Sequence, residues 1–367
     1  MALIAQASSG SPAQIDAVDA LRGFAIALVV MVHAQLVVVP APGFLAGMAD
    51  LGARGVQLFY VVSAYTLYRS LAHRWHAGED HLIGRYFIRR FFRIAPMFYL
   101  VVAFNLATLG FAPRHWAPGG IGWLDLLATV TFANAWVPNA ITSAVDGGWS
   151  IAIEWNFYLL LPLLVVPLRT GRRALAFALG AGLAGYGLSG ILSQWLTPAG
   201  AADAHVVAGF FKFWLPYQLI AFGAGIVLFH APDIFAGDES RARWLAPSLL
   251  LVSIAVFFFV GKWFPLKVAA LALFAYVVLH RPAALLVNPA TIWLGRLSYS
   301  VYFLHFLVLR YAAAPLASLL EGLPTAVAFW IGYLAVLAGS SALAYVTWRA
   351  VERPGMALGA MLARRLR

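Results

Sequence analysis

Arg22 and His33 are two ionisable residues in an otherwise almost entirely apolar segment, 20–35. Because they are eleven residues apart, they fall within roughly 20° of one face of a helix, about 16 Å apart along its axis. Ionisable side chains are costly inside a membrane and are functional candidates by default, so the pair offers a fixed cation and, deeper in, a titratable base. Asp19, three residues before Arg22, can pair with it. The alternative is that Arg22 extends toward the membrane surface and His33 is a hydrogen-bonded packing residue.

A second constellation is a run of arginines between positions 85 and 93. Arg90 and Arg93 are three residues apart and therefore share one face of a helix. Two guanidinium groups on one face can clamp a phosphorylated ligand through paired hydrogen bonds. The alternative is that the whole run anchors the chain on the cytoplasmic side of the membrane; it comprises Arg85, Arg89, Arg90 and Arg93.

A third constellation contains Trp149, Ser150 and Glu154, near the beginning of an apolar segment that runs to Leu168. Ser150 and Glu154 are four residues apart, so they share a helix face, which the topology below places toward the outer side. A carboxylate near the N-terminus of a helix is also an ordinary capping and dipole-stabilising device, and that alternative stays open.

A fourth constellation is a polar stripe late in the chain. Tyr299, Tyr302 and His305 recur at every third position of an apolar segment. The stripe can bind a substrate, or it can be a hydrogen-bond network between membrane helices. Glu352 closes the last apolar segment, where it can pair with a neighbouring arginine.

The composition defines the elements that must position these residues. Hydrophobic residues make up 63% of the 367 residues and charged residues 11%, against about 25% charged in soluble domains. We therefore predict an all-α integral membrane protein. The net charge of +11 lies in short loops between apolar runs, which disfavours nucleic acid as a partner. The absence of cysteine excludes disulfides, cysteine metal sites and a cysteine nucleophile, and we expect no metal cofactor.

Ten segments are long and apolar enough to span a membrane, given that about 20 residues are needed. No cleavable signal peptide is expected, because the N-terminal tail has no basic region before the first apolar segment. The ten predicted spans are 16–39, 54–72, 86–111, 149–168, 173–195, 207–230, 244–261, 265–280, 290–318 and 323–349.

The arginines and lysines predict the orientation. With the N-terminus in the cytoplasm, most of them fall in inward-facing gaps, as the positive-inside rule requires. A span at 123–137 would reverse every later loop, so we interpret that segment as a short re-entrant or interfacial helix. The predicted organisation is a cytoplasmic tail at 1–15, a transmembrane domain at 16–352 and a basic cytoplasmic tail at 353–367.

These constellations resemble, in order and over nearly the whole chain, the motifs of the membrane-bound acyltransferase family 3. Each motif is weak alone, and the ordered set is fairly specific. The matching positions are Arg22 with His33; the stretch 55–63, ending in Ser63; Arg90 with Arg93; Trp149, Ser150 and Glu154; Ser298, Tyr299, Tyr302 and His305; and Glu352 with Pro354.

The chain departs from the family pattern at a few positions. Gln57 stands where an acidic residue is common, Ala64 and Tyr65 replace glycine and phenylalanine, and Phe303 replaces a leucine. None of these changes removes a proposed catalytic group, so they bear on packing near Ser63 and on the fit of the acceptor.

The resemblance implies a ten-helix bacterial cytoplasmic-membrane enzyme, with both termini in the cytoplasm. It implies transfer of an acyl group, with acetyl as the expected one, from cytoplasmic acyl-CoA to a hydroxyl. The expected acceptor is a cell-surface or exported glycan, so the activity would be O-acetylation of a polysaccharide; lipid-linked and small hydroxyl compounds are further acceptors in the family.

The resemblance also assigns roles. His33 is the expected general base, by direct transfer or through an acyl-enzyme. Arg22, Arg90 and Arg93 are expected to hold the CoA part of the donor, with Arg22 also counted among the catalytic residues. Glu154 is expected to orient His33 or the acceptor. The expected substrate-binding residues are Trp149, Ser150, Tyr302 and His305.

A rival interpretation is a transporter or flippase for a glycan or lipid, because ten helices with buried ionisable residues also suit translocation. It predicts no dependence on acyl-CoA, and it favours broken helices or a repeat in the two halves, which the sequence does not show. A membrane scaffold or inactive relative is a third possibility. The joint presence of Arg22, His33 and Glu154 argues against it.

Overall fold

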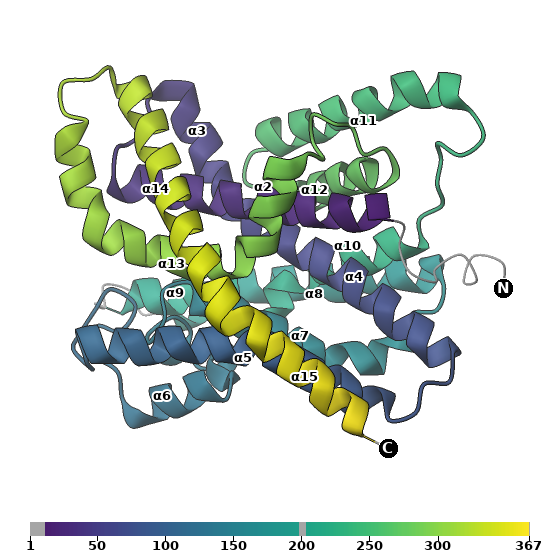
Figure 1. Ribbon diagram of the computed structural model, residues 1–367, viewed down its shortest axis with the longest axis horizontal. Coiled ribbons are helices and arrows are strands. Elements are labelled where there is room, and N and C mark those ends of the chain that lie inside the picture. The colour runs from purple at the N-terminus through teal and green to yellow at the C-terminus, as the bar shows by residue number, and fades with distance from the viewer. Residues whose placement is uncertain (1–11, 198–202, 367) are drawn as a thin grey trace. The chain divides into compact units, whose positions relative to one another are not determined.

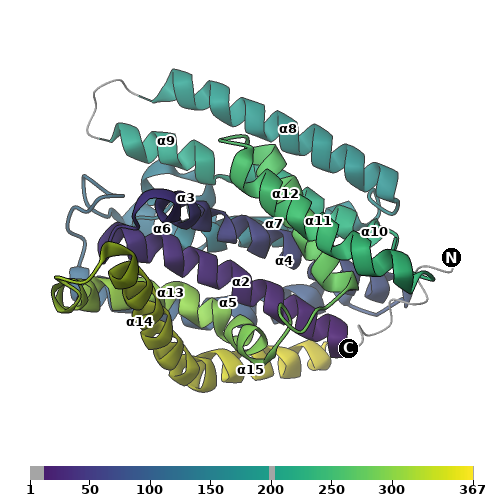
Figure 2. The same ribbon diagram turned by 90° about the horizontal axis from the view of Figure 1, so that it is seen from above.

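The structure is a computed structural model that describes residues 12–197 and 203–366. Apart from one isolated bridge between Arg114 and Ala117, the described residues form helices, turns and loops. An α-helix pairs its backbone N–H and C=O groups within one segment, which a membrane interior requires. The all-α prediction is therefore confirmed for the described part of the chain (Figures 1 and 2).

Each of the ten predicted spans coincides with a helix, and one of them is broken into two pieces at Trp214. These helices are α2 (Pro12–Val37), α4 (Gly55–His76), α5 (Leu82–Leu109), α7 (Gly148–Val165), α8 (Gly171–Leu196), α9 (Ala204–Phe213) with α10 (Leu215–His230), α11 (Glu239–Phe259), α12 (Phe264–His280), α13 (Pro289–Leu319) and α14 (Thr325–Thr347).

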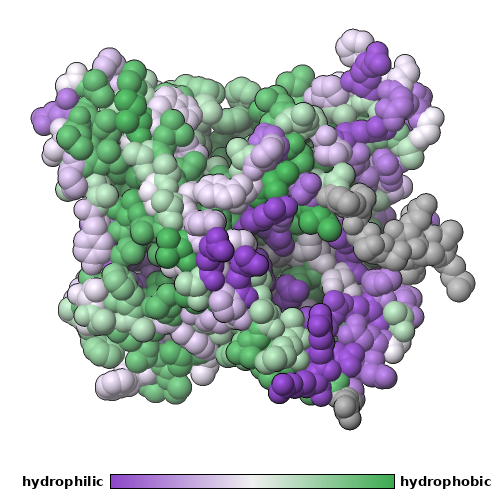
Figure 3. Space-filling view, in the orientation of Figure 1, coloured by the Kyte–Doolittle hydropathy of each residue, from purple (hydrophilic) through white to green (hydrophobic). Residues whose placement is uncertain are grey.

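Seven helices of the described chain are long and apolar enough to cross a membrane, with Phe264–His280 as a shorter apolar helix. Figure 3 shows hydrophobic residues over much of the face it presents, and hydrophilic residues gathered around the C-terminal end of α15 (Arg353–Arg365). The chain is therefore a multi-pass membrane protein. Residues 353–365, predicted to belong to a basic tail, form this last helix.

The segment 123–137 contains only the short helix α6 (Trp123–Val130) and a 3-10 turn, Ala133–Trp136. Eight residues extend about 12 Å, well short of a membrane span. Asp125 accepts a hydrogen bond from the backbone N–H of Gly122, which fixes the beginning of α6. The prediction of a short helix here is confirmed.

The chain divides into two compact units, each made of two stretches. Unit 1 contains residues 1–63 and 231–348. Unit 2 contains residues 64–230 and 349–367.

In unit 1, α2 is the central helix. It packs against α3 (Gly43–Leu51), the turn Gly52–Arg54, α12, α13 and α14. The closest packing is against α13, where a Cβ on Gly295 would overlap the carbonyl oxygen of Asp19, and one on Gly23 would overlap that of Thr291. Only glycine permits this approach of the two backbones.

In unit 2, α7 packs against α5, α9 and α10, and α8 lies along α10. The helix α15 lies along α5, with Gly355 and Gly359 facing Pro96 and Phe92. These small residues, four apart, let the two helices approach closely. A π-helical turn, Trp348–Glu352, precedes α15, and Pro354 stands in its first turn, where a missing N–H does no harm.

Candidate active site

The site in unit 1 is a pair of imidazoles, His33 on α2 and His305 on α13, 272 residues apart in the chain. Nδ1 of His33 lies 3.2 Å from Nε2 of His305. The ring of Phe306 packs against both, with centroids 4.7 Å from His33 and 4.0 Å from His305. His33 is half-buried, whereas His305 is 0% exposed. We call these two residues the imidazole pair.

Both imidazoles also contact their own helices. Nδ1 of His33 is 2.8 Å from the carbonyl oxygen of Val29, and Nδ1 of His305 is 3.1 Å from that of Val301. Each contact spans one helical turn, which fixes the direction of the ring relative to its helix. Of the two imidazoles, His33 is partly exposed, whereas His305 is fully buried and contacts it.

Tyr302 belongs to the same environment. It precedes His305 by about one turn of α13, is buried, and has its ring centroid 5.9 Å from that of His305. The structure thus brings together His33, Tyr302 and His305, three of the residues singled out from the sequence. His305 has no exposed surface, so its side chain contacts its neighbours, including His33, and not the solvent.

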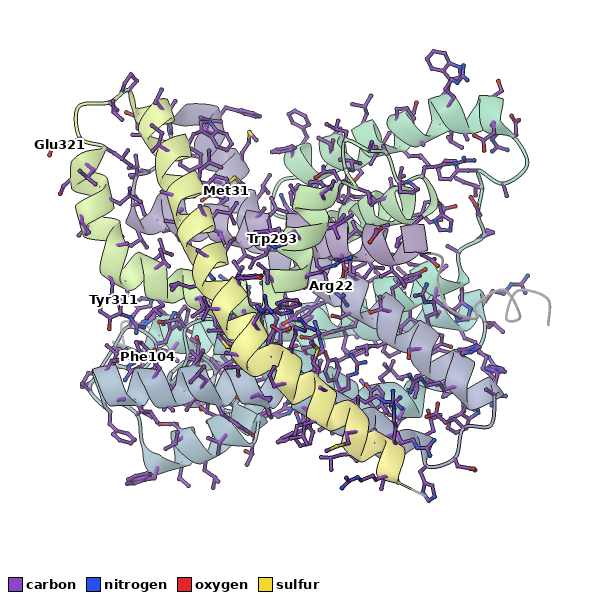
Figure 4. All side chains as sticks on the ribbon, viewed as in Figure 1. Arg22, Met31, Phe104, Trp293, Tyr311 and Glu321 are labelled. Carbon is purple, nitrogen blue, oxygen red and sulfur yellow. The ribbon has the colours of Figure 1, made fainter. Side chains whose placement is uncertain are left out.

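Arg22 lies at the other end of the predicted face. It forms the predicted ion pair with Asp19, at 3.5 Å. Asp19 also binds Arg296 of α13 at 3.1 Å, and Arg296 reaches Asp16 at 3.3 Å. The guanidinium of Arg22 (labelled in Figure 4) is thus part of a charged cluster in the first half of α2, about 16 Å along the axis from His33.

Two pairs of contacts show that α2 and α13 run in the same direction. Asp19 meets Arg296, and further along both helices His33 meets His305. The glycine contact near Asp19 holds the two backbones together at the first of these points. The beginning of α13 is fixed by Asn288, whose side chain accepts hydrogen bonds from the backbone N–H groups of Ala290 and Thr291.

The site in unit 2 is a cluster of Glu154, Tyr158, Arg90 and Arg93, which we call the arginine–glutamate cluster. The hydroxyl of Tyr158 donates to Glu154 at 2.7 Å. Both arginines and Glu154 lie close enough to Tyr158 to act on it electrostatically. Helix α5 supplies the cations, and α7 supplies the carboxylate and the phenol.

Glu154 is the seventh residue of α7, about 9 Å from the beginning of the helix, and the first turn of α7 contains no acidic residue. A helix-capping role for Glu154 is therefore excluded. A buried phenol, that of Tyr158, donates a hydrogen bond to it, so the carboxylate has a specific partner away from the end of the helix.

The two arginines of the cluster differ in their partners. Arg93 forms an ion pair with Glu352 at 3.8 Å and also contacts the sulfur of Met356, at 3.3 Å. Arg90 has no carboxylate within ion-pairing distance among the described residues, and its buried Nε atom has no hydrogen-bond partner among them. Arg93 is thus held in place, whereas Arg90 keeps its charge available for an anionic ligand.

Ser150 and Trp149 lie near the start of α7. The Ser150 hydroxyl donates to the carbonyl oxygen of Gly147 at 3.1 Å and is buried. Trp149 stacks on Phe213 with ring centroids 4.3 Å apart, and it packs against the core formed by Ile141, Phe210 and Phe211. Both residues hold the start of α7 in place, one turn or more before Glu154.

Sequence reasoning missed Tyr158 and Arg296 as members of the two sites. Tyr158 could have been found, because it lies four residues after Glu154 on the same helix face. Arg296 could not, because its partners Asp16 and Asp19 come from the other end of unit 1's sequence.

Comparison with known proteins adds an independent finding. A family model described as an acyltransferase domain matches residues 15–349. The acyltransferase MdmB of Streptomyces mycarofaciens is 25% identical over 297 residues, covering 72% of this chain and 70% of that protein. BcsY of Komagataeibacter xylinus is 26% identical over 359 residues, covering 92% and 82%. The peptidoglycan O-acetyltransferase OatA of Listeria monocytogenes is 24% identical over 159 residues, covering 40% and 24%. No solved structure matches the chain.

Proposed function

Because this chain belongs to the acyltransferase 3 family and is a membrane acyltransferase, we propose that it transfers an acyl group from acyl-CoA to an acceptor hydroxyl, with His33 as general base. The observation that carries the proposal is the imidazole pair. A half-buried histidine inside an apolar helix, in contact with a second histidine, supports a role in proton transfer.

The proposed reaction moves one proton from the acceptor hydroxyl to the CoA thiolate by way of His33. The acceptor hydroxyl gives its proton to His33 while its oxygen attacks the thioester carbonyl carbon. The C–S bond then breaks, and the CoA thiolate leaves and takes a proton back from the imidazolium. Proton transfer of this kind contributes roughly 10²–10⁴-fold to the rate. This step is direct transfer, and transfer through an acyl-histidine or acyl-serine enzyme is the alternative.

The arginine–glutamate cluster supports a role in donor binding. The phosphates of CoA are anionic, and Arg90 keeps a guanidinium without a carboxylate partner among the described residues. Arg93 lies one turn further on α5, held by Glu352. Arg22, in its cluster with Asp19, is the third proposed contact for the CoA part. Glu154 would orient the acceptor.

For the acceptor, we propose a glycan hydroxyl and acetyl as the acyl group. The name of OatA, a peptidoglycan O-acetyltransferase, supports this class. Trp149, Ser150 and Tyr302 are the proposed contacts of the acceptor. We further propose that both termini face the cytoplasm of a bacterium and that the chain lies in its inner membrane, because that orientation puts most arginines on the inward side.

The test is binding and turnover of acetyl-CoA by purified protein in nanodiscs. CoA release is followed with a thiol reagent, and the chain itself contributes no thiol because it has no cysteine. We expect the protein to bind acetyl-CoA and then to release CoA. The acetyl group should appear on added glycan or, after transfer to water, as acetate. Translocation of a glycan or lipid without acetyl-CoA binding would contradict the proposal and favour a transporter.

A further inference from the structure

The contacts of the imidazole pair determine which ring nitrogen carries hydrogen. Nδ1 of His33 faces the carbonyl oxygen of Val29 at 2.8 Å, and Nδ1 of His305 faces that of Val301 at 3.1 Å. A carbonyl oxygen has no hydrogen to donate, so each Nδ1 must be the donor of its contact. In a neutral imidazole the other nitrogen, Nε2, then carries the lone pair.

The contact between the rings agrees with this assignment. Nε2 of His305, which carries a lone pair, lies 3.2 Å from Nδ1 of His33, so the single hydrogen on that nitrogen is shared between the carbonyl oxygen of Val29 and Nε2 of His305. The opposite tautomers would set a nitrogen lone pair against each carbonyl oxygen. A charged His305 would place N–H against N–H and would leave a cation with no exposed surface.

We propose that His305 is a positioning residue that, together with the carbonyl oxygen of Val29, holds the hydrogen of His33 on Nδ1, so that Nε2 is the nitrogen that takes the acceptor proton. This inference rests on the proposed function of His33. His305 touches His33 and no reacting atom, because it has no exposed surface. Its role corresponds to that of the group that orients a catalytic histidine in hydrolases.

The proton balance follows from this arrangement. The acceptor O–H gives its proton to Nε2 of His33, and the ring becomes an imidazolium with hydrogen on both nitrogens. The Nδ1–H group then donates more strongly to Nε2 of His305, because a hydrogen bond from a charged donor is stronger. When the CoA thiolate takes the proton back from Nε2 of His33, both rings return to their starting tautomers.

A second imidazole suits this position better than a carboxylate would. A buried carboxylate in a membrane helix is ionised only at a high desolvation cost, whereas a neutral imidazole accepts a hydrogen bond without carrying charge. Val301 and Val29 supply the two carbonyl oxygens that hold the rings. Val29, Val301 and Phe306, which contact the two rings, carry no charge.

Three variants of His305 separate its role as a hydrogen-bond acceptor from the packing of its ring. In His305→Gln the side-chain amide reaches the place of Nε2 and its oxygen can accept from His33. In His305→Asn the shorter amide reaches only the place of Nδ1. His305→Phe keeps a ring and removes both nitrogens. We expect His305→Gln to keep kcat for acetyl-CoA hydrolysis within about tenfold, and the other two to lower kcat about a hundredfold with little change in KM.

A spectroscopic readout tests the tautomer without activity. In protein labelled with ¹⁵N-histidine, the His33 signals, assigned by their loss in His33→Gln, should show hydrogen on Nδ1 in the wild type and in His305→Gln. In His305→Phe, where only the carbonyl oxygen of Val29 still accepts from Nδ1, they should show a measurable added fraction with hydrogen on Nε2. The matched control is His280→Phe, because Nδ1 of His280 has the same contact with a carbonyl oxygen one turn earlier, and the ring of Tyr276 packs against it. This control should leave kcat and the His33 signals unchanged.

Hydrogen on Nε2 of His33 in the wild type would overturn the proposal, whether or not any variant folds. Wild-type kcat in both His305→Asn and His305→Phe would also overturn it. If His33→Ala kept full turnover, the proposed function would fail instead. The ¹⁵N signals would still report whether His305 sets the tautomer of His33, so the two failures are distinguishable.

Discussion

The carboxylate of Glu352 and the guanidinium of Arg93 form an ion pair 3.8 Å long, in which Glu352 is 1% exposed and the Arg93 side chain 30% exposed. Arg93 belongs to α5, so this ion pair joins α5 to the residue that directly precedes α15. The π-helical turn Trp348–Glu352 places the carboxylate at this contact. Turns of this kind are frequently found at functional sites.

We expect Glu352→Gln to destabilise unit 2 and weaken donor binding. Loss of the buried carboxylate leaves Arg93 without this partner, which lowers the free energy of unfolding by about 1–3 kcal/mol. The KM for acetyl-CoA should rise several-fold, with a smaller change in kcat. The matched control is Glu239→Gln, because Glu239 is 85% exposed in its ion pair with Arg281, and such pairs contribute under about 1 kcal/mol. Equal unfolding temperatures for the two variants would contradict this account.

Arg90→Ala should raise the KM for acetyl-CoA at least tenfold, because it removes the guanidinium that has no carboxylate partner among the described residues. The sharper measurement compares acetyl-CoA with acetyl-pantetheine, which lacks the nucleotide phosphates. The variant should lose the preference for acetyl-CoA. Arg89→Ala is the control, because Arg89 is paired with Glu79. A preference that survives in Arg90→Ala would show that the phosphates bind elsewhere.

Tyr158→Phe should lower kcat about tenfold and leave the KM for acetyl-CoA nearly unchanged, because it removes the hydroxyl that donates to Glu154 at 2.7 Å. Tyr68→Phe is a matched control, since the Tyr68 hydroxyl is also buried and also donates at 2.7 Å, to the carbonyl oxygen of Leu168. Both variants should lose similar stability, measured by thermal unfolding. A fall in kcat of the same size in both would mean that the effect at Tyr158 is general loosening of unit 2.

Gly295→Ala should both destabilise the protein and lower turnover. The added Cβ would overlap the carbonyl oxygen of Asp19, so α2 and α13 must move apart, which also changes the contact between His33 and His305. We expect a loss of about 1–3 kcal/mol in the free energy of unfolding. Gly190→Ala on α8 is the control, because nothing lies near its added Cβ, and alanine there should stabilise the helix by roughly 0.5–1 kcal/mol. A neutral Gly295→Ala would contradict the close helix crossing.

Hydrophobicity alone located the helices of the ten predicted spans, but not α3 or α15, because a span needs about 20 apolar residues and the runs are separated by polar or Gly- and Pro-rich gaps. It missed the break at Trp214, where two short helices share one apolar run. Periodicity also predicted the Asp19–Arg22 pair, because both residues lie on one turn. It could have added Tyr158 to Glu154 by the same reasoning.

Contacts between distant segments could not be read from spacing. His33 and His305 lie 272 residues apart, and their contact depends on the glycine crossing of α2 and α13. The exposure of a side chain within a polar stripe is a tertiary property for the same reason. The spacing of residues 299–305 predicted polar side chains on one helix face. It could not predict that His305 is fully buried in contact with His33, because that depends on how α2 and α13 pack.

The most direct test of the central claim measures acetyl-CoA turnover and acetyl-CoA binding together in His33→Ala. The account predicts that turnover falls by at least a hundredfold, because the base is lost, while the affinity for acetyl-CoA stays within about threefold of wild type. That result would locate the chemistry at His33 in a correctly folded protein. Full turnover in His33→Ala, with binding unchanged, would show that another residue takes the acceptor proton.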